Sequence, residues 1–451
     1  MSEPFLAFRQ RLDLLFRPEG TLFYGWKIVG VGILVQYLGS LLWMQAYGAY
    51  TVLLQEEFGW SMTTLSVAFA LTRIESGLLG PLQGWLVDRY GPRKVLSVGM
   101  VLFGGGMFFL ALTETVVSYY VAVVFISLGA SLGGFHTLMV AIVHWFSRHR
   151  TKAVAWTQMG YAFGGLSIPM LAFALEQFGW RMVATGSGVI LFLIGLPLVQ
   201  YIRHDPEEVG EKVDGIRSER LLQSPSGSKE AHSMTWREAL KTPAFWLISA
   251  GHGIALLTVS TVIVHLIPFL TRSFEMSLTT AGVVFGTVST FQFVGQLFGG
   301  YLGDRFDKRL LCVGCMLAHG SGLLILVYFE SLWMTLLFSL LHGLAWGIRG
   351  PLMVALRADY FGSKSFGLIM GISSMIVMLG TMGGPVISGV MVDHFGDYRL
   401  AFQGIALSAS IGAVCFWAAR KPKRDELEEE GKGEELKRTG GREHLRSDQS
   451  A

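Results

Sequence analysis

Long apolar stretches follow one another along most of the sequence, and this pattern constrains the fold more than any other feature. A helix needs about 20 apolar residues to cross the hydrocarbon core of a bilayer. About twelve stretches of this length lie between Tyr24 and Arg420, and most are separated by short polar or glycine-containing turns. Hydrophobic residues make up 51% of the chain and charged residues only 15%, against about 25% in soluble proteins. We therefore predict an all-α membrane protein with about twelve transmembrane helices.

A long polar segment divides these spans into two equal groups. It carries many charges and the run Ser-Pro-Ser-Gly-Ser, and Thr235-Trp-Arg-Glu238 near its end predicts the capping box of a short helix. The sequences at the two ends of the chain are more polar than the spans. The predicted organisation is a cytoplasmic amphipathic segment at 1–23, a first six-helix bundle at 24–202, a cytoplasmic linker at 203–243, a second six-helix bundle at 244–420 and a disordered cytoplasmic tail at 421–451.

The distribution of lysine and arginine predicts the orientation. If the N-terminus is cytoplasmic, most basic residues, Arg357 among them, fall in inside loops, and the outside loops carry mainly acids. Only Arg181, Arg272 and Arg399 oppose this trend. We expect an even number of spans, both termini in the cytoplasm, and a multi-pass protein of the cell membrane.

The two halves repeat in sequence. The segment Gly84–Arg93 follows the second span, and Gly300–Arg309 follows the eighth. The same offset pairs the segment from Phe58 to Ser61 with that from Phe274 to Ser277, and nearly the same offset pairs Phe178-Gly179 with Phe395-Gly396. Internal duplication is typical of secondary transporters, whose two halves move around a central site. The repeat therefore predicts two pseudo-symmetric bundles.

The first copy of the repeated loop, Gly84-x-Leu86-x-Asp88-Arg89-x-Gly91-x-Arg93, resembles the signature loop between the second and third helices of the major facilitator superfamily. The second copy departs from it at Asp307, where the pattern has glycine. The resemblance covers Tyr24 to Arg420 and implies a transporter that works by alternating access. It also implies gating residues that stabilise the outward-open state: Gly84, Asp88, Arg89, Arg93, Asp304, Arg305 and Arg309. The alternative is a basic loop that fixes topology and has no gating role.

Shorter stretches resemble a narrower branch of that superfamily. Tyr24-Gly25-Trp26, Phe58-Gly-Trp60-Ser61 and the segment from Thr235 to Trp246 are similar to bacterial monocarboxylate and oxalate/formate porters. Those families move small organic anions, often with a proton or by exchange. The resemblance therefore implies a symporter or antiporter for a small organic anion, with a carboxylate as the expected substrate.

Charged residues inside the spans are candidates for function because burying them in a membrane is costly. Arg73 and Glu75 lie in the second span and Arg349 in the tenth. The resemblance implies that the first, fourth, seventh and tenth helices line the central cavity, which makes Arg349 the first candidate for a substrate ligand and Arg73 the second. A guanidinium forms a planar fork that matches a carboxylate. The alternative for Arg349 is a structural pairing near the cytoplasmic gate.

Helical spacing and the repeat supply further candidates, because residues three and four apart share a face. Thr258, Thr261 and His265 share a face of the seventh span, and Gln158 and Tyr161 are plausible cavity residues of the fifth. For any single histidine, packing between helices is the competing interpretation. The remaining predicted substrate-binding residues are Gln36, Trp43, Tyr47, His136, Gln292, Gln296, His342 and Trp346.

Two residues are candidates for proton coupling. Glu75 is two positions from Arg73, so the two side chains point to different faces and cannot pair simply within one helix. A buried acid must be neutralised by another helix or by a proton. Glu75 is therefore either a proton carrier or a structural acid held by a basic partner, and His265 is the second candidate for coupling.

Other functional classes lack support in the sequence. The histidines show no metal-ligand spacing, Cys312 and Cys315 lie in an apolar span without partners, and no phosphate-binding loop is present. A net charge of +3 gives no indication of nucleic-acid binding. We expect a transporter that is no enzyme, needs no cofactor or metal, contacts lipid and its small-molecule substrate, and functions as a monomer. The competing functions are multidrug or other efflux and, more remotely, a membrane sensor that does not transport.

Overall fold

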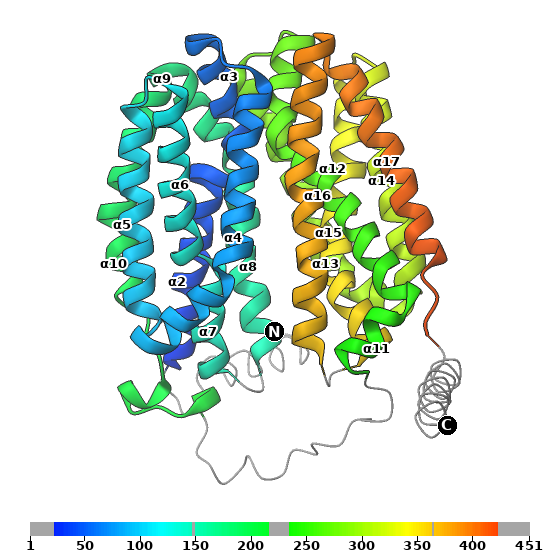
Figure 1. Cartoon of the computed structure of the whole chain (residues 1–451). Helices are drawn as coiled ribbons and strands as arrows, with labels where there is room; N and C mark the ends of the chain where they lie inside the picture. Colours follow the sequence, from blue (N-terminus) through cyan, green and yellow to red (C-terminus); the bar gives the residue numbers. More distant parts are fainter. Residues whose placement is uncertain (1–21, 147–148, 216–233, 363–364, 423–451) are drawn as a thin grey trace, which may run out of the picture.

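The computed structural model describes residues 22–146, 149–215, 234–362 and 365–422. These residues form two helical bundles that lie side by side (Figure 1). The first bundle contains α2 (Tyr24–Gly39), α3 (Tyr47–Phe58), α4 (Met62–Tyr90), α5 (Pro92–Ala111), α6 (Val116–Leu132), α7 (Phe135–Trp145), α8 (Arg150–Leu166), α9 (Ile168–Ile190) and α10 (Leu196–Val199). The second contains α12 (Pro243–Ser273), α13 (Leu278–Arg305), α14 (Lys308–Tyr328), α15 (Leu332–Phe361), α16 (Phe366–Phe395) and α17 (Tyr398–Ala418).

The helices account for the predicted crossings. Within the described residues, 10 helical segments are long and apolar enough to span a membrane. The helix α4, which carries Arg73 and Glu75, is not among them, but it runs alongside the others (Figure 1). Gly179 has a φ of 75° inside α9, which divides that helix into two legs, and the first leg continues the course of α8. The all-α fold of two six-helix bundles is therefore confirmed.

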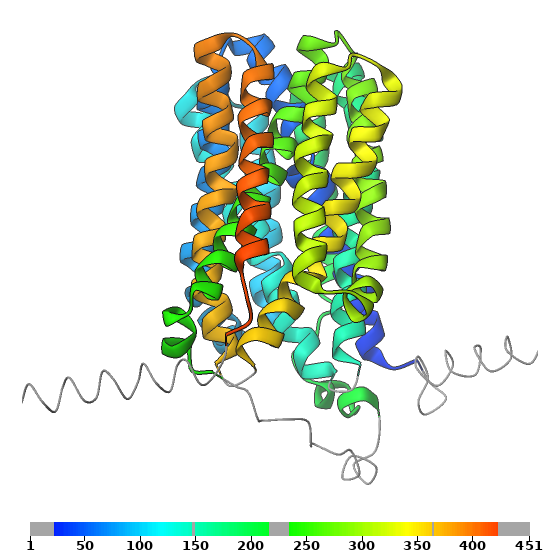
Figure 2. The same ribbon diagram turned by 90° about the vertical axis from the view of Figure 1, so that its right-hand side faces the viewer.

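The linker contributes the short predicted helix and lies at one end of the molecule. The helix α11 (Trp236–Lys241) begins with the predicted capping box, in which the side chain of Thr235 accepts from the backbone of Glu238. We call the end with α11 the linker end (Figure 1), and the opposite end, where α3 leads into α4 and α16 into α17, the far end (Figure 2). The predicted amphipathic segment and the predicted tail lie almost entirely outside the described residues.

The backbone reproduces the sequence repeat at its turns. Gly59 and Glu275, which the repeat aligns, both have positive φ, 65° and 51°. Gly179 and Gly396 match in the same way, with φ of 75° and 71°. Positive φ is normally a glycine conformation, so its retention at a glutamate shows how closely the two turns correspond.

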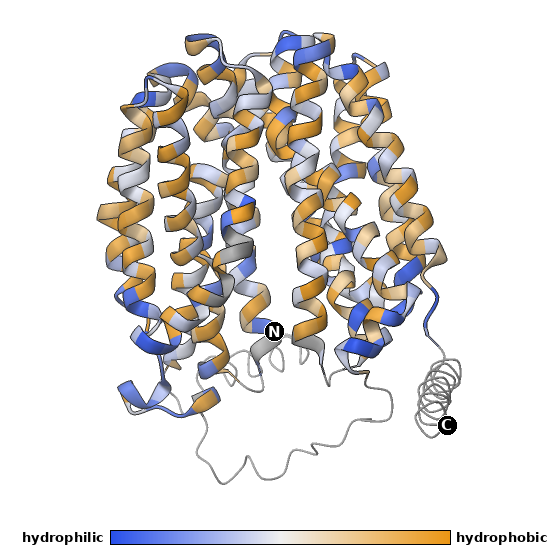
Figure 3. Cartoon of the chain, viewed as in Figure 1, coloured by the Kyte–Doolittle hydropathy of each residue, from blue (hydrophilic) through white to orange (hydrophobic). Residues whose placement is uncertain are grey.

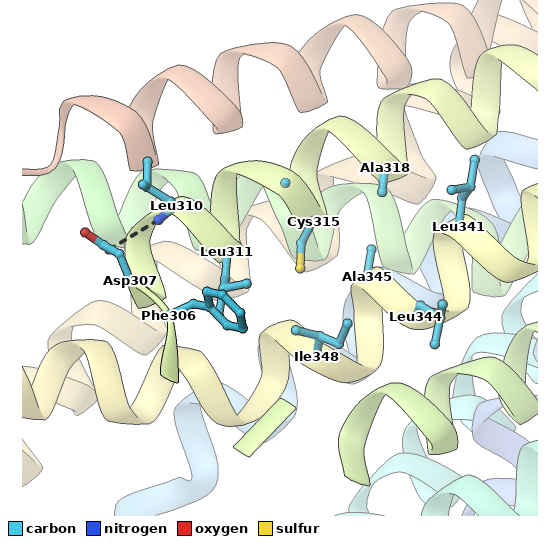
Figure 4. A pocket seen from close by; sticks show the side chains of 11 residues that line it. Phe306, Asp307, Leu310, Leu311, Cys315, Ala318, Leu341, Leu344, Ala345 and Ile348 are labelled. Atoms are coloured by element: carbon cyan, nitrogen blue, oxygen red, sulfur yellow. Dashed lines mark hydrogen bonds between the residues drawn. The ribbon is translucent and has the colours of Figure 1, made fainter. Parts of the chain in front are cut away.

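The departure at Asp307 also has a structural reason. In the first copy, Gly91 has a φ of 80° and forms the turn into α5. In the second copy, Asp307 has an ordinary φ of −59° and caps α14 with its side chain. Its carboxylate accepts from the backbone N–H groups of Arg309 and Leu310 at 2.8 and 3.3 Å, the second of which is drawn in Figure 4. An aspartate is therefore suited to this turn because it supplies a helix cap.

The two bundles differ in the continuity of their helices. In the second, every crossing is one uninterrupted helix, even where Pro268, Pro351 or Pro385 lies within it. In the first, a π-helical turn at Ser40–Met44 interrupts the first crossing, and the pair Gly133-Gly134 separates α6 from α7. Such breaks are common where a helix lines a binding site.

The bundles meet closely at the far end. All hydrogen bonds recorded between them within the described residues lie in the far half or near mid-height, among them that of Ser66 with His265 and that of Thr279 with Glu176. A Cβ added to Gly48 would lie 2.8 Å from the backbone oxygen of Ile263. In Figure 1 the ribbons of the two bundles lie farther apart at the linker end than at the far end, where the recorded hydrogen bonds join them.

Of the three basic residues in the predicted outside loops, Arg181 and Arg399 form ion pairs with acidic residues. Arg181 pairs with Glu57, and Arg399 lies 2.5 Å from a carboxylate oxygen of Glu330. Figure 3 shows the apolar residues along the middle of the helices and the polar ones concentrated toward the two ends. The expectation for Arg357 is wrong, because this residue lies within α15, is 2% exposed and makes hydrogen bonds there.

Candidate functional site

A cavity of about 800 Å³ lies between the bundles and brings together residues from both halves. This volume is within the range of typical small-molecule sites. Six of the predicted substrate-binding residues line it: Gln36, Arg73, Gln292, Gln296, Trp346 and Arg349. Gln158 and Tyr161, expected from the fifth span, line it as well. No aspartate or glutamate is among the described lining residues, so the charged side chains of the cavity are its two arginines.

Arg349 is a buried cation without a counter-charge. Its side chain is 1% exposed, and its Nε has no hydrogen-bond partner. No ion pair or hydrogen bond is recorded for it in the described part of the chain. Removing one partner of a buried ion pair costs about 3 kcal/mol or more, because it leaves a buried charge uncompensated. A buried cation without a counter-charge carries a penalty of the same order. An anion in the cavity would remove that penalty.

Arg73 approaches the same cavity from the first bundle. Its Nη2 donates to the Sδ of Met44 at 2.7 Å, and its guanidinium lies 4.9 Å from the ring centroid of Phe69. Its Nε is buried and has no hydrogen-bond partner. A thioether is a weak acceptor, so this guanidinium also retains most of its capacity to bind an oxygen ligand.

A smaller pocket of about 250 Å³ adjoins the cavity within the first bundle. The two share Arg73 and Tyr161, and the side pocket extends to the break between α6 and α7. Trp43 and His136 line this pocket rather than the central cavity. The helix breaks of the first bundle therefore lie directly beside the site.

Tyr47 and His342 face away from both cavities. The hydroxyl of Tyr47 lies 2.5 Å from the carbonyl oxygen of Leu65 and 2.7 Å from the hydroxyl of Tyr119. Regular spacing places Tyr47 on the face of Gln36, but the π-helical turn between them inserts an additional residue and rotates Tyr47 away. His342 is fully buried, and its Nδ1 lies 3.0 Å from the Nδ1 of His319 on α14.

Sequence reasoning selected the wrong face of the seventh span. The face with Thr258, Thr261 and His265 packs against α16 instead, where Thr261 lies close to Gly384. The residues of α12 that line the cavity are His252, Leu256, Val259, Ser260 and Ile263. The sequence repeat could have identified the cavity-lining face of this span, because the offset that aligns Ser61 with Ser277 also aligns Gln36 with His252.

The proton-coupling candidates both lie outside the cavity wall. Glu75 accepts a hydrogen bond from Ser127 of α6 at 3.2 Å, so it faces away from Arg73 as expected from its position. His265 is fully buried, and its Nε2 lies 2.9 Å from the carbonyl oxygen of Pro385 and 3.3 Å from the hydroxyl of Ser66. His265 thus occupies the contact between the bundles.

The loop residues predicted to gate transport are at the linker end. Asp88, Arg89, Arg93, Asp304 and Arg305 are exposed, and none has a recorded bond to the opposite bundle within the described residues. Arg309 is half-buried and donates to the carbonyl of Trp417 in its own bundle at 3.2 Å. Gly84 has no heavy atom within 4 Å of an added Cβ, so no neighbouring helix approaches it closely in this conformation.

Two other features differ from the cavity in chemistry. A groove of about 440 Å³ between α14 and α15 is lined by apolar residues and, among charged ones, only Asp307 (Figure 4). None of its described lining residues is basic, so it offers no group to bind an anion.

At the linker end, His144, His204 and Asp205 come together, and the Nδ1 of His144 lies 2.8 Å from a carboxylate oxygen of Asp205. That contact satisfies the carboxylate without an ion.

Two helical bundles around a central cavity with two buried arginines are the architecture of a membrane transporter. The sequence profile of the Major Facilitator Superfamily matches residues 30–265 and 248–451, and this chain belongs to that superfamily. It is therefore an integral membrane protein and not an enzyme, and its substrate is a small molecule.

Similar proteins support the assignment. The chain is 25% identical to the MFS transporter asaE of Aspergillus flavus over 88% of this chain and 87% of the relative. It is 23% identical to the glycerol-3-phosphate transporter of Bacillus subtilis over 86% and 91%. Its fold resembles a bacterial homologue of the human lysosomal transporter Spinster in an inward-facing and occupied conformation, with a TM-score of 0.71, 16% identity, and coverage of 89% of this chain and 97% of that one.

Proposed function

We propose that the chain is a secondary active transporter that moves a small organic anion, specifically a carboxylate, by alternating access. The observation that carries this proposal is Arg349, a cavity-lining guanidinium that is 1% exposed and has no acidic partner. Arg73 supplies a second cationic group from the other bundle. A carboxylate that bridges these groups would contact both bundles, so its binding would be coupled to their relative movement.

The neutral donors around the cavity suit the same ligand. Gln36, Gln292 and Gln296 offer amide N–H groups, and Trp346 offers an indole N–H. These groups can orient an anion without neutralising the guanidiniums. The relatives give compatible examples: the glycerol-3-phosphate transporter is named for an anion, and a stretch of 196 residues is 24% identical to the oxalate:formate antiporter of Oxalobacter formigenes, over 43% of each chain.

The proposal also includes the group that carries the coupled proton and the orientation of the protein in the membrane. We assign the proton to Glu75, because it is an intramembrane acid on the same helix as Arg73 and outside the cavity wall. The linker end, with the basic loops, is the cytoplasmic end of a protein in the cell membrane. In this proposal the protein acts as a monomer, the arrangement described here corresponds to its inward-open state, and Asp88 and Arg93 act in the opposite state.

Efflux of amphipathic compounds is the second candidate. It is favoured by the apolar part of the cavity wall, which includes Phe69, Leu256 and Ile263. Multidrug resistance protein 2 of Bacillus subtilis is 20% identical over 87% of this chain and 92% of that protein. The two unpaired guanidiniums argue against a cationic drug, because they would repel it.

Thermal stability of the purified protein tests the proposal directly. Formate, oxalate, lactate, benzoate, sugars and cationic drugs would be compared on the wild type, Arg349→Gln and the control Arg399→Gln, whose arginine pairs with Glu330 at the surface. A ligand present at a hundred times its Kd stabilises by about 2.7 kcal/mol. We expect a carboxylate to stabilise the wild type and the control but not Arg349→Gln. Stabilisation by cationic drugs alone would support efflux instead.

A further inference from the structure

A second buried arginine, Arg357 of α15, lies behind the cavity wall. Its Nη2 donates to the Nδ1 of His252 at 3.1 Å and to the hydroxyl of Ser373 at 2.7 Å. Its Nη1 donates to the carbonyl of Met353 at 3.1 Å. Arg357 is 2% exposed and does not line the cavity, whereas His252 does. The guanidinium therefore reaches the site only through the histidine.

This contact determines where the proton of His252 lies. A guanidinium has five N–H donors and no acceptor, and it remains protonated in proteins. The Nδ1 of His252 must therefore accept, so the neutral ring carries its hydrogen on Nε2. The Nδ1 cannot take up a proton while Arg357 donates to it.

The other nitrogen of the ring is available to a ligand. His252 has a recorded hydrogen bond through Nδ1 only, and its Nε2 is not among the buried atoms that lack a partner. Since His252 is one of the cavity-lining residues, its Nε2–H is open to the cavity.

We propose that His252 is a specificity-determining residue that donates its fixed Nε2–H to the substrate carboxylate, and that Arg357 is the positioning residue that fixes this tautomer. This inference rests on the proposed anion transport and extends it. His252 and Arg349 would bind the carboxylate together from the second bundle, one as a neutral donor and one as a cation. The histidine thereby orients the carboxylate through a directional hydrogen bond, and it does not act as a proton carrier.

The charged and polar groups around His252 agree with the assigned tautomer. The charged groups that face it are Arg349 and Arg357, both on α15. From α16 the nearby polar groups are the hydroxyls of Ser373, bound to Arg357, and Thr381, on the cavity wall. No acidic side chain lines the cavity within the described residues. Two cations and no carboxylate therefore surround the ring, and the guanidinium of Arg357 occupies the one nitrogen that a second proton would need.

Nitrogen NMR of the histidine-labelled protein tests the tautomer without any ligand. The His252 signal is identified by its loss in His252→Gln. We expect the wild type and Arg357→Lys, which retains a donor, to keep the neutral Nε2–H form between about pH 8 and 5.5, and Arg357→Met to titrate in that range. An Nδ1–H form, or a protonated ring in the wild type at the lower pH, would overturn the inference.

Binding of the most stabilising carboxylate among formate, oxalate, lactate and benzoate tests the role. We expect His252→Leu to weaken binding about tenfold or more, while His252→Gln, whose amide N–H replaces Nε2–H, stays within a fewfold. In Arg357→Met the affinity should rise as the pH falls, an effect absent from Arg357→Lys. Unchanged binding in His252→Leu, with binding lost in Arg349→Gln, would refute the role of His252 and leave the proposed function intact. If no carboxylate binds, the proposed function fails and the role of His252 as a carboxylate donor fails with it, while the NMR experiment still decides the tautomer.

Discussion

Asp393, in the last turn of α16, binds the first turn of α4 in the opposite bundle through Thr63. One oxygen of its carboxylate accepts from the backbone N–H and the hydroxyl of Thr63, at 2.7 and 2.5 Å, and the other accepts from the N–H of Met62 at 2.9 Å. A carboxylate at a helix N-terminus satisfies free N–H groups and interacts favourably with the helix dipole. The far end is thus held closed by a helix cap contributed from the other bundle.

The repeat reproduces this contact in the other half. Glu176, near the end of the first leg of α9, accepts from the backbone N–H of Thr279 at 3.0 Å and from its hydroxyl. Thr63 and Thr279 are aligned by the repeat, and Glu176 and Asp393 occupy nearly aligned positions. Each bundle therefore caps a helix of the other, and the proposed opening of the far end would break both contacts.

The first prediction concerns these caps. Asp393→Ala and Glu176→Ala should each weaken closure of the far end by about 1 kcal/mol, the usual contribution of a helix cap. The double variant should shift the ratio of states by more than tenfold, since 1.4 kcal/mol is a factor of ten. Distances between spin labels across the far end would measure the ratio. Asp397→Ala is the control, because Asp397 caps α17 within its own bundle, and an equal shift in that variant would contradict the prediction.

The second prediction concerns the close approach of α3 and α12. In Gly48→Ala the new methyl group would lie 2.8 and 3.0 Å from the backbone oxygens of Ile263 and Val264. We expect it to force the bundles apart at this point and increase labelling of a single cysteine placed at the far end. Gly39→Ala in the same crossing meets no atom within 4 Å and should leave labelling unchanged. Equal labelling in both variants would show that this contact does not limit closure.

The third prediction concerns Glu75. If this acid carries the coupled proton, Glu75→Gln should abolish accumulation of substrate driven by a pH gradient in proteoliposomes. Exchange of labelled for unlabelled substrate should continue, because the amide can still accept from Ser127 and the cavity wall is unchanged. The same measurements on Glu56→Gln, which changes an exposed acid of α3, control for the loss of one negative charge. Gradient-driven uptake that persists in Glu75→Gln would assign coupling to another group.

The fourth prediction concerns the loop at the linker end. Gly84 is surrounded by open space here, but the superfamily pattern implies that this end closes in the opposite state. We expect Gly84→Leu to bind substrate with unchanged affinity from the linker side and to transport it at least tenfold more slowly, because the side chain obstructs closure. Gly105→Leu, also free of close neighbours, serves as the control. Normal transport by Gly84→Leu would favour the alternative that this loop only fixes topology.

The fold could be predicted from the sequence because its determinants are local and repeated. Apolar length predicted the crossings and the repeat predicted two corresponding bundles, a correspondence that extends to the positive φ shared by Gly59 and Glu275. Arg73 and Arg349 were identified by the cost of placing charge in a membrane. These signals need no knowledge of how the helices pack.

The remainder of the site depends on helix rotation, which composition does not determine. The π-helical turn before Tyr47 changed the face of every residue after it, and such turns have no clear sequence signal. Arg357 was assigned to a loop because a charge near a predicted helix end is normally exposed, whereas here α15 continues to Phe361 and buries it. His252 could have been found, since the repeat aligns it with Gln36.

The two unpaired guanidiniums have an electrical consequence. When one end of the cavity is closed, the membrane voltage falls across that end, and the cavity takes the potential of the side to which it is open. In the proposed alternating-access cycle, a change of the open end would move the cavity charge through the voltage, at about 2.3 kcal/mol per charge for each 100 mV. In the empty cavity no described lining residue offsets the charges of Arg73 and Arg349, while a bound dianion would offset them. The return of the empty protein would then be the voltage-sensitive step, and the resting potential would set how fast the cycle restarts.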